Sequence, residues 1–357
     1  MFKKAPLSEG SRRGNYSEGE TMDSLTDFQT LWFFLILILF MGYSLLDGFD
    51  LGIGILLPFL GRTKEERDIL IGSISPVWDG NEVWLITGGG ALFAAFPHAY
   101  ATAFSGFYPA VMLILFALIF RAVSMEFRAQ DEARSAIWEK AFSAGSLLAA
   151  LLFGVALGNV VYGVPLNEKM EFTGNFFTLL RPVPLLFGVT GFAAVLLQGA
   201  SWAVMKTDGE LQARSFRAAG ILLWVNVIAA ISYFLTIAFV FEDVAINWLF
   251  YVAILFNLLW LSAIFFSLRH KNDVSPFWES SFAFIGLWLA VAIVHFPNLI
   301  KAGNDLKFSL TIYNSSTGLK TLQLMSLIAL IGMPVVVTYT VFVYRIFKGK
   351  VKSSVHY

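Results

Sequence analysis

The chain has 357 residues, of which 57% are hydrophobic and 14% charged, whereas a soluble domain of average composition carries about 25% charged residues. Its 25 Lys and Arg balance its 25 Asp and Glu, so no net field attracts nucleic acid or a strongly charged partner. Cysteine is absent, which excludes disulfides, cysteine-ligated iron–sulfur clusters and thiolate-bound haem. The composition therefore excludes an ordinary soluble protein and predicts an integral membrane protein.

The N-terminal segment precedes any long apolar run. Residues 1–20 contain four basic residues but no apolar core, which argues against a cleavable signal peptide. We predict that residues 1–30 form a disordered tail, and Met22 is a candidate natural start.

Long apolar segments follow one another along the rest of the chain. About 20 apolar residues are needed to cross a bilayer as a helix, and only helices or closed barrels satisfy their backbone groups there. Nine transmembrane helices are predicted, close to Leu31–Pro58, Ile69–Pro97, Phe104–Val123, Ala141–Tyr162, Val183–Val204, Ala219–Phe241, Asn247–Leu268, Ser281–Ile300 and Thr321–Phe347.

The predicted fold class is an all-α integral membrane protein. Nine helices suggest two four-helix bundles and one extra helix. The first bundle is expected over residues 31–163, a second transmembrane part over 164–347, and a cytoplasmic tail over 348–357.

Basic residues alternate between the two sides of the predicted membrane. Segments on one side, with the adjoining helix ends, hold 16 Lys and Arg, those on the other side hold 5, and the N-terminal tail holds 4. Because basic residues collect on the cytoplasmic side, the N-terminus is expected outside and the C-terminus in the cytoplasm.

Two pairs of acids lie inside the first two predicted helices. Asp47 and Asp50 share one helix face, as do Asp79 and Glu82, because each pair is three residues apart. Measured from the predicted cytoplasmic helix ends, Asp50 and Asp79 lie about 12 and 15 Å deep. On the same scale Asp47 and Glu82 lie about 16 and 20 Å deep. The four acids are thus expected at similar depths on neighbouring helices.

Ionisable groups in a membrane are costly and commonly functional. Acids at one depth without a basic neighbour favour proton uptake and transfer, so the pattern predicts a proton pathway entered from the cytoplasm. The alternatives are that these acids cap helix breaks or bond across the helix pair, or that they form a Na⁺ site. Glu126 is a candidate for the pathway mouth, whereas Arg121 and Arg128 have the spacing of anchors that extend to the membrane surface.

Histidine placement argues against haem in this chain. Of four histidines only His295 lies within a predicted helix, and ligation by two histidines needs two at matching depth. His295 is a weak candidate haem ligand, because a lone histidine is usually a core residue. No metal site is predicted.

Several motifs resemble subunit II of the cytochrome bd type quinol oxidases of bacteria and archaea. The resemblance is dense from Leu31 to Arg128 and continues more thinly to the C-terminus. The matching stretches are Leu46–Gly52, then Trp78–Thr87 with Trp78, Asn81 and Trp84 beside the acids, and Gly89–Ala95, Ala103–Tyr108 and Thr173–Phe177.

The resemblance implies a multi-pass protein of the prokaryotic cytoplasmic membrane. It implies a haem-bearing subunit I as partner, with two b-type haems and one d-type haem, and sometimes small single-helix subunits. The complex is expected to oxidise quinol and reduce O2 to water with cytoplasmic protons, while subunit II binds no haem. Acids at the positions of Asp47, Asp50, Asp79 and Glu126 are expected to line the proton route. Some members hold a quinone in this subunit, but no motif here places one.

Two other functions remain open from the sequence. Intramembrane acids on broken helices are also typical of proton-coupled transporters, although no convincing inverted repeat is present. The chain could instead be a purely structural subunit whose acids serve helix packing.

Overall fold

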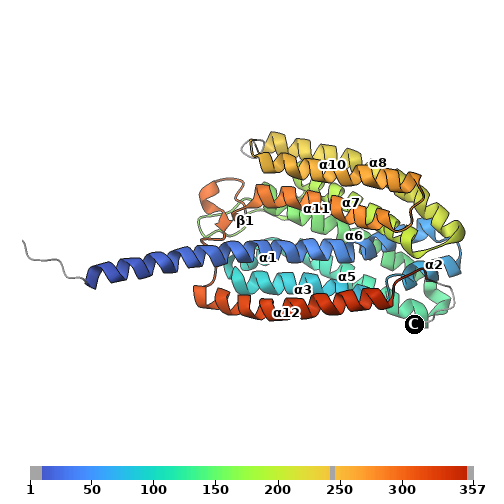
Figure 1. Cartoon of the computed structure of the whole chain (residues 1–357), viewed down its shortest axis with the longest axis horizontal. Helices are drawn as coiled ribbons and strands as arrows, with labels where there is room; N and C mark the ends of the chain where they lie inside the picture. Colours follow the sequence, from blue (N-terminus) through green and yellow to red (C-terminus); the bar gives the residue numbers. More distant parts are fainter. Residues whose placement is uncertain (1–9, 242–245, 352–357) are drawn as a thin grey trace, which may run out of the picture.

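The computed structural model describes residues 10–241 and 246–351, and side chains from residue 23 onward. Long helices run side by side along the longest axis (Figure 1), and eight of those in the described part are long and apolar enough to cross a membrane. The helices are α1 (Gly10–Leu60), α2 (Lys64–Gly72), α3 (Trp78–Ala95), α4 (Pro97–Gly106), α5 (Tyr108–Gln130), α6 (Ser135–Tyr162), α7 (Pro182–Lys206), α8 (Gly209–Val240), α10 (Trp248–Arg269), α11 (Ser275–His295) and α12 (Leu319–Ile346). Three 3-10 turns are η1 (Glu132–Arg134), η2 (Phe176–Leu179) and η3 (Leu306–Phe308).

The first helix begins earlier than expected. Residues 10–30, expected as a disordered tail, belong to α1, while residues 1–9 and 352–357 lie outside the described residues. No proline interrupts α1 before Pro58, so a helix formed in the apolar segment can continue towards the N-terminus.

The second predicted helix is not continuous, which corrects the expectation for Ile69–Pro97. α2 ends at Gly72, a turn containing Pro76 follows, and α3 begins at Trp78. Proline lacks a backbone N–H and disfavours helical geometry in the residue before it, so Pro76 explains the break. α2 starts at a capping box in which Thr63 and Glu66 accept each other's backbone N–H groups.

Within the described residues, the contacts between the long helices form two groups of four, with α12 beside them. α1 contacts α3 and α6, and α6 contacts α5; α7 contacts α8 and α11, and α10 contacts both of these. The groups meet where α1 and α6 pack on α7, and α12 lies against α1 and α3. At the α1–α7 crossing, a Cβ on Gly52 would lie 2.8 Å from the Cα of Gly199, so the small residues permit the approach.

The eighth span lies earlier in the chain than predicted. α11 covers Ser275–His295 instead of Ser281–Ile300, and the residues after it form β1 (Asn298–Ile300), which pairs antiparallel with β2 (Leu310–Thr311). Pro297 cannot continue the helical hydrogen bonds. We call the end of the bundle with this sheet the β1 end and the opposite one, with α2, the α2 end (Figure 1).

Candidate site of buried acids on the first helices

Asp47 and Asp50 are the two fully buried acids of α1. Both have 0% exposure, and their spacing of three residues places them on one helix face, as predicted. Burial of a carboxylate is costly unless it is paired or hydrogen-bonded, so the partners of each acid determine its chemistry.

Arg121 on α5 is the partner of Asp47. Its Nη2 lies 2.6 Å from Asp47 Oδ1 and its Nη1 lies 3.0 Å from Asp47 Oδ2, a two-point contact in which neither side chain is exposed. Nη1 also lies 2.8 Å from Glu82 Oε1 on α3. One arginine therefore compensates two carboxylates, which corrects the expectation of acids without a basic neighbour.

The predicted helix end explains why Arg121 was misassigned as a surface anchor. The third span was expected to end at Val123, but α5 continues to Gln130 and leaves Arg121 nine residues from its end. At 1.5 Å per residue this places Arg121 about 14 Å from the end of α5. It turns instead towards the buried acids.

Asp50 has a different environment. Its Oδ2 accepts a hydrogen bond of 2.7 Å from Asn81 Nδ2, whereas its Oδ1 is buried without a partner among the described residues. Asn81 also donates to the Leu46 carbonyl at 3.1 Å and accepts from the Tyr344 hydroxyl at 2.9 Å. Tyr344 belongs to α12 and was not singled out in the sequence, because it lies 263 positions from Asn81.

The other residues of the Trp78–Trp84 motif divide between core and surface. Trp78 packs against the core near α2, and the ring of Trp84 would lie 2.5 Å from a Cβ on Gly42 of α1, which explains the glycine there. Asp79 is exposed in the first turn of α3, so it lies at the start of a helix and not within a continuous second span. Only Asn81 of this motif is fully buried.

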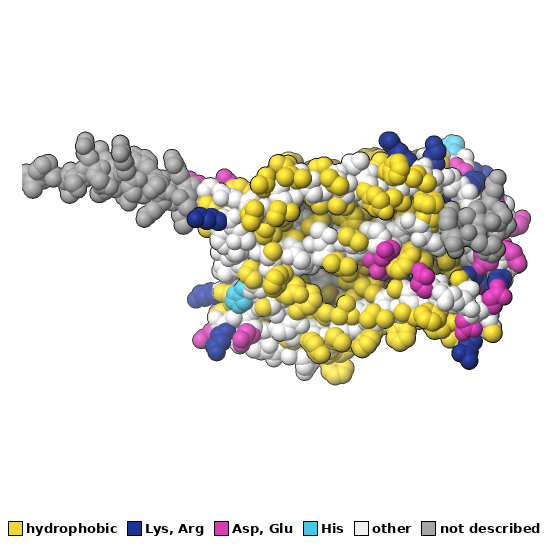
Figure 2. Space-filling model, turned by 90° about the horizontal axis from the view of Figure 1, so that it is seen from below, with side chains coloured by type: hydrophobic (Ala, Val, Ile, Leu, Met, Phe, Trp, Pro, Cys, Tyr) yellow, Lys and Arg dark blue, Asp and Glu magenta, His cyan; other side chains and the backbone are white. Residues whose placement is uncertain are grey.

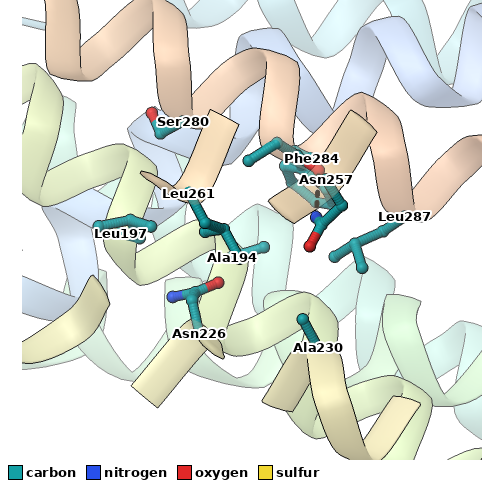
Figure 3. A pocket seen from close by; sticks show the side chains of 10 residues that line it. Ala194, Leu197, Asn226, Ala230, Asn257, Leu261, Ser280, Phe284 and Leu287 are labelled. Carbon is teal, nitrogen blue, oxygen red and sulfur yellow. Dashed lines mark hydrogen bonds between the residues drawn. The ribbon is translucent and has the colours of Figure 1, made fainter. Parts of the chain in front are cut away.

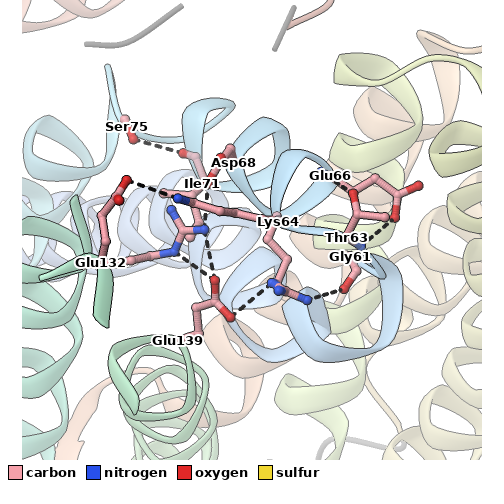
Figure 4. A network of polar contacts seen from close by, with 11 residues as sticks. Gly61, Thr63, Lys64, Glu66, Asp68, Ile71, Ser75, Glu132 and Glu139 are labelled. Atoms are coloured by element: carbon pink, nitrogen blue, oxygen red, sulfur yellow. Dashed lines mark hydrogen bonds and ion pairs between the residues drawn. The ribbon is translucent and has the colours of Figure 1, made fainter. Parts of the chain in front are cut away.

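Ion pairs connect the segments at the α2 end. Arg128 contacts Asp68 at 2.6 Å and Glu139 at 2.9 Å, and Glu139 also contacts Arg67 at 3.0 Å (Figure 4). Glu126 is exposed, and Arg128 pairs with acids of α2 and α6 rather than with it. The structure thus does not bring Glu126 together with the buried acids.

The surface over α3, α5 and α12 combines apolar and acidic groups. Figure 2 shows this side as largely hydrophobic, with acidic side chains inside the hydrophobic band as well as at the charged ends. Asp79 is exposed and Glu82 half-buried, and the neighbouring Val83 and Ile86 are 46% and 72% exposed. Such a surface is unsuited to contact with lipid tails alone.

His295 lies far from these acids along the bundle, at the β1 end. It is buried, its Nε2 lies 3.1 Å from the Leu299 carbonyl, and its ring lies 6.1 Å from that of Phe33. His98 and His270 are exposed, so no second described histidine lies beside it. These surroundings do not fit a haem held by two histidines.

A second polar cluster lies among α7, α8, α10 and α11. A cavity of about 10 Å³ is lined by Asn226, Asn257, Ser280 and apolar side chains (Figure 3). Asn257 donates to the Ala283 carbonyl, and its Oδ1 is buried without a partner among the described residues. The volume suits one water molecule, and no titratable side chain lines it.

The site offers two carboxyl groups of different character. Asp47 is held in an ion pair, whereas Asp50 has one oxygen free to accept a hydrogen bond or a proton. A buried acid of the second kind can change its protonation state without breaking an ion pair of its own.

Comparison with known sequences identifies relatives over nearly the whole chain. The family model described as cytochrome bd terminal oxidase subunit II matches residues 28–347. Cytochrome bd-I ubiquinol oxidase subunit 2 of Escherichia coli strain K12 is 34% identical over 93% of this chain and 99% of its own length. Cytochrome bd ubiquinol oxidase subunit 2 of Bacillus subtilis is 32% identical over 93% and 98%, respectively.

A solved structure agrees in fold. The bd oxidase from Geobacillus thermodenitrificans contains a chain that matches with a TM-score of 0.75 at 15% identity, over 90% of this chain and 98% of that one. Because the family model covers the span that holds all the helices from the apolar part of α1 to α12, the match includes the site as well as the fold. The chain therefore belongs to the family of subunit II of the cytochrome bd terminal oxidases.

Proposed function

We propose that this chain conducts protons from the α2 end of the bundle towards the O2-reducing centre of its partner subunit. The observation that supports this most directly is the fully buried Asp50, whose Oδ1 has no partner among the described residues. Asp47, Glu82, Asp79 and Glu126 are the further proposed carriers or entry groups. This role rests on the family membership, which makes the chain a subunit of a quinol oxidase complex in the bacterial inner membrane.

The redox chemistry is assigned to the partner. We expect subunit I to hold two b-type haems and one d-type haem, to oxidise quinol and to reduce O2 to water, as the family resemblance implies. Small single-helix subunits and a bound quinone are compatible with this assignment. What the present chain contributes is the supply of protons and a packing surface.

The α2 end is the proposed point of entry. Its loops carry most of the basic residues, which is the pattern of a cytoplasmic side. The ion pairs of Arg128 and Arg67 hold α2, α5 and α6 together at this end without involving Asp47 or Asp50. Protons from the cytoplasm therefore meet fixed surface charges first and the buried acids next.

The face over α3 is the proposed contact with the partner. An acid at the centre of a membrane costs at least about 2.5–3.5 kcal/mol on insertion scales, so an exposed Asp79 beside exposed apolar side chains needs protein or water next to it. A subunit docked there would shield Asp79 and Glu82 from lipid. It would also place the end of the route beside the haem-bearing chain.

Substitution of single acids tests the proton route. Asp50→Asn keeps the size of the side chain, and its amide oxygen can accept the hydrogen bond from Asn81. The amide cannot take up and release a proton as the carboxyl group does. We expect O2 consumption per haem d by the intact complex to fall at least about tenfold, within the range that a positioned proton carrier contributes. Asp79→Asn should give a smaller loss, because its carboxyl is exposed. The haem spectrum should stay unchanged in both variants.

Asp305→Asn is the matched control. Asp305 is exposed at the β1 end and caps η3, and asparagine serves equally well as a cap. Its turnover should equal that of the wild type. Wild-type turnover in both Asp50→Asn and Asp79→Asn would refute the proton route.

A structural role is the second candidate, and the Arg121–Asp47 ion pair is the observation that favours it. A buried pair of this kind can orient α1, α3 and α5 without any transfer of protons. In that case Asn should be tolerated at Asp50, because a neutral amide costs less to bury than a carboxylate. The family membership replaces the proton-coupled transporter that the sequence alone left open.

A further inference from the structure

We propose that Tyr344 of α12 is a positioning residue that acts through Asn81 to fix the carboxyl group of Asp50. The proposal rests on the proton route proposed above and adds a residue to it. Three contacts support it: the Tyr344 hydroxyl to Asn81 Oδ1 at 2.9 Å, Asn81 Nδ2 to Asp50 Oδ2 at 2.7 Å, and Asn81 Nδ2 to the Leu46 carbonyl at 3.1 Å.

The partners of Asn81 determine which way its amide faces. An ionised carboxylate and a backbone carbonyl only accept hydrogen bonds, so the amide nitrogen faces Asp50 and Leu46. The amide oxygen then faces α12, where the Tyr344 hydroxyl is the group that donates to it. Both amide hydrogens and the amide oxygen of Asn81 therefore have hydrogen-bond partners. If the amide were flipped, its oxygen would face the carboxylate oxygen of Asp50, and the two would repel each other.

The consequence for Asp50 concerns its second oxygen. With Oδ2 held by Asn81, rotation of the carboxyl group is restrained and Oδ1 keeps a fixed direction. Without Tyr344 the buried Asn81 loses the partner of its oxygen, and its amide is free to turn. The carboxyl group of Asp50 then no longer presents one defined acceptor, which slows transfer through it.

The position of α12 makes this contact more than a local detail. α12 packs mainly on α1 and α3, and Leu322 is its one fully buried side chain among the described residues. Apolar contacts at both ends of α12 are accompanied by hydrogen bonds: near the β1 end Trp32 donates to the Leu322 carbonyl and the Ser326 hydroxyl, and near the α2 end Lys206 donates to the Phe347 carbonyl. The Tyr344 contact thus links the position of α12, at the edge of the bundle, to the hydrogen bonding of the buried Asp50 on α1.

Tyr344→Phe in the intact oxidase complex tests the proposal. Phenylalanine keeps the ring beside Phe49 and Trp202, at centroid distances of 6.4 and 6.3 Å, and removes only the hydroxyl. We expect O2 consumption per haem d to fall about three- to tenfold, the factor that one neutral hydrogen bond is worth. Tyr339→Phe is the matched control, because Tyr339 is 64% exposed on the same helix, and it should retain the wild-type rate.

Infrared spectroscopy supplies a second measurement that does not depend on turnover. The carboxyl band that is lost in Asp50→Asn should shift in Tyr344→Phe and stay in place in Tyr339→Phe. The double variant Tyr344→Phe/Asp50→Asn should be no slower than Asp50→Asn, since the hydroxyl acts only through this acid.

The outcomes separate this proposal from the proton route. A wild-type rate in both Asp50→Asn and Asp79→Asn, with a shifted band in Tyr344→Phe, would refute the route and keep the positioning role. A slow Asp50→Asn with a wild-type rate and an unshifted band in Tyr344→Phe would overturn the positioning role and keep the route. A lower yield of complex with a normal rate per haem and an unshifted band would assign Tyr344 to assembly alone and also overturn it.

Discussion

Removal of the Arg121 guanidinium should destabilise this subunit more than any surface charge can. Arg121→Met keeps an unbranched apolar chain in place of the arginine stem but leaves Asp47 buried without compensation, where both groups are 0% exposed. Breaking a buried pair by removing one partner costs about 3–5 kcal/mol. Glu82, the other partner, has a side chain that is 21% exposed, and water can compensate part of its loss.

Two further variants isolate the buried charge as the cause. Arg121→Met/Asp47→Asn removes both members of the closest pair and should recover most of the lost stability, because a neutral amide is less costly to bury. Arg128→Met breaks partly exposed pairs at the α2 end, for which the expected cost is about 0–1 kcal/mol.

The assay is the thermal inactivation of the purified complex, followed as the half-life of haem-normalised O2 consumption at a fixed temperature. A rate is the proper measure because large membrane complexes unfold irreversibly. Arg121→Met should shorten the half-life at least tenfold relative to Arg128→Met. Equal half-lives for these two variants, or no recovery in the double variant, would refute the argument that an uncompensated Asp47 dominates.

Three other predictions concern packing, topology and pH. Gly52→Val should abolish or strongly reduce assembly, because its Cβ would meet the Gly199 backbone, whereas Gly332→Ala, with nothing within 4 Å, should assemble normally on a gel of the native complex. Glu66 accepts hydrogen bonds from Arg214 and from backbone N–H groups, which hold its pKa below the usual 4.5; its contribution to stability is therefore present above that pH and lost as pH falls through the lower folded value. Thermal inactivation of Glu66→Gln should accordingly depend less on pH between 6 and 3 than that of the wild type, and an equal dependence would exclude this role. Reporter fusions at the α2 end should all give cytoplasmic signals, and an external signal from any of them would overturn the orientation; the sites are Arg62, Arg134, Arg214, His270 and Lys350.

Local periodicity predicted the part of the site that lies on one helix. The spacing of Asp47 and Asp50 places them on one face of any helix, and the apolar stretch around them required that helix to be a membrane span. The structure adds that this face is fully buried in the bundle, which the spacing alone did not determine, since Asp79 and Glu82 have the same spacing and are not buried. The family resemblance, carried by the same residues, was confirmed by relatives that match over most of the chain.

The remaining parts depended on where helices end and on contacts between distant segments. A proline-containing turn at Pro76 moved Asp79 from the interior of a helix to its first turn, and α5 continues seven residues beyond its predicted end, which places Arg121 deeper within the helix than predicted. An apolar composition predicts that a segment spans the membrane, but it does not predict the residue at which the helix ends. Polar residues can continue a helix beyond the apolar segment. The role of Tyr344 could not be predicted, because its contact with Asn81 joins two residues 263 positions apart and no local sequence pattern in α12 indicates that contact.

The hydrogen bonds that α12 makes with α1 and α3 join the first helices to leave the ribosome to the last helix of the described chain. Trp32 finds its acceptors only when residues 322–326 have been made, and Asn81 finds its donor only when residue 344 follows. A nascent chain that stops before α12 can already pair Arg121 with Asp47, yet the amide beside Asp50 has no completed network. Packing of α12 on the earlier helices is therefore a late step of biogenesis. A chain truncated before α12 still contains Asp47 and Asp50, but it lacks the Tyr344 hydrogen bond that orients Asn81 beside Asp50.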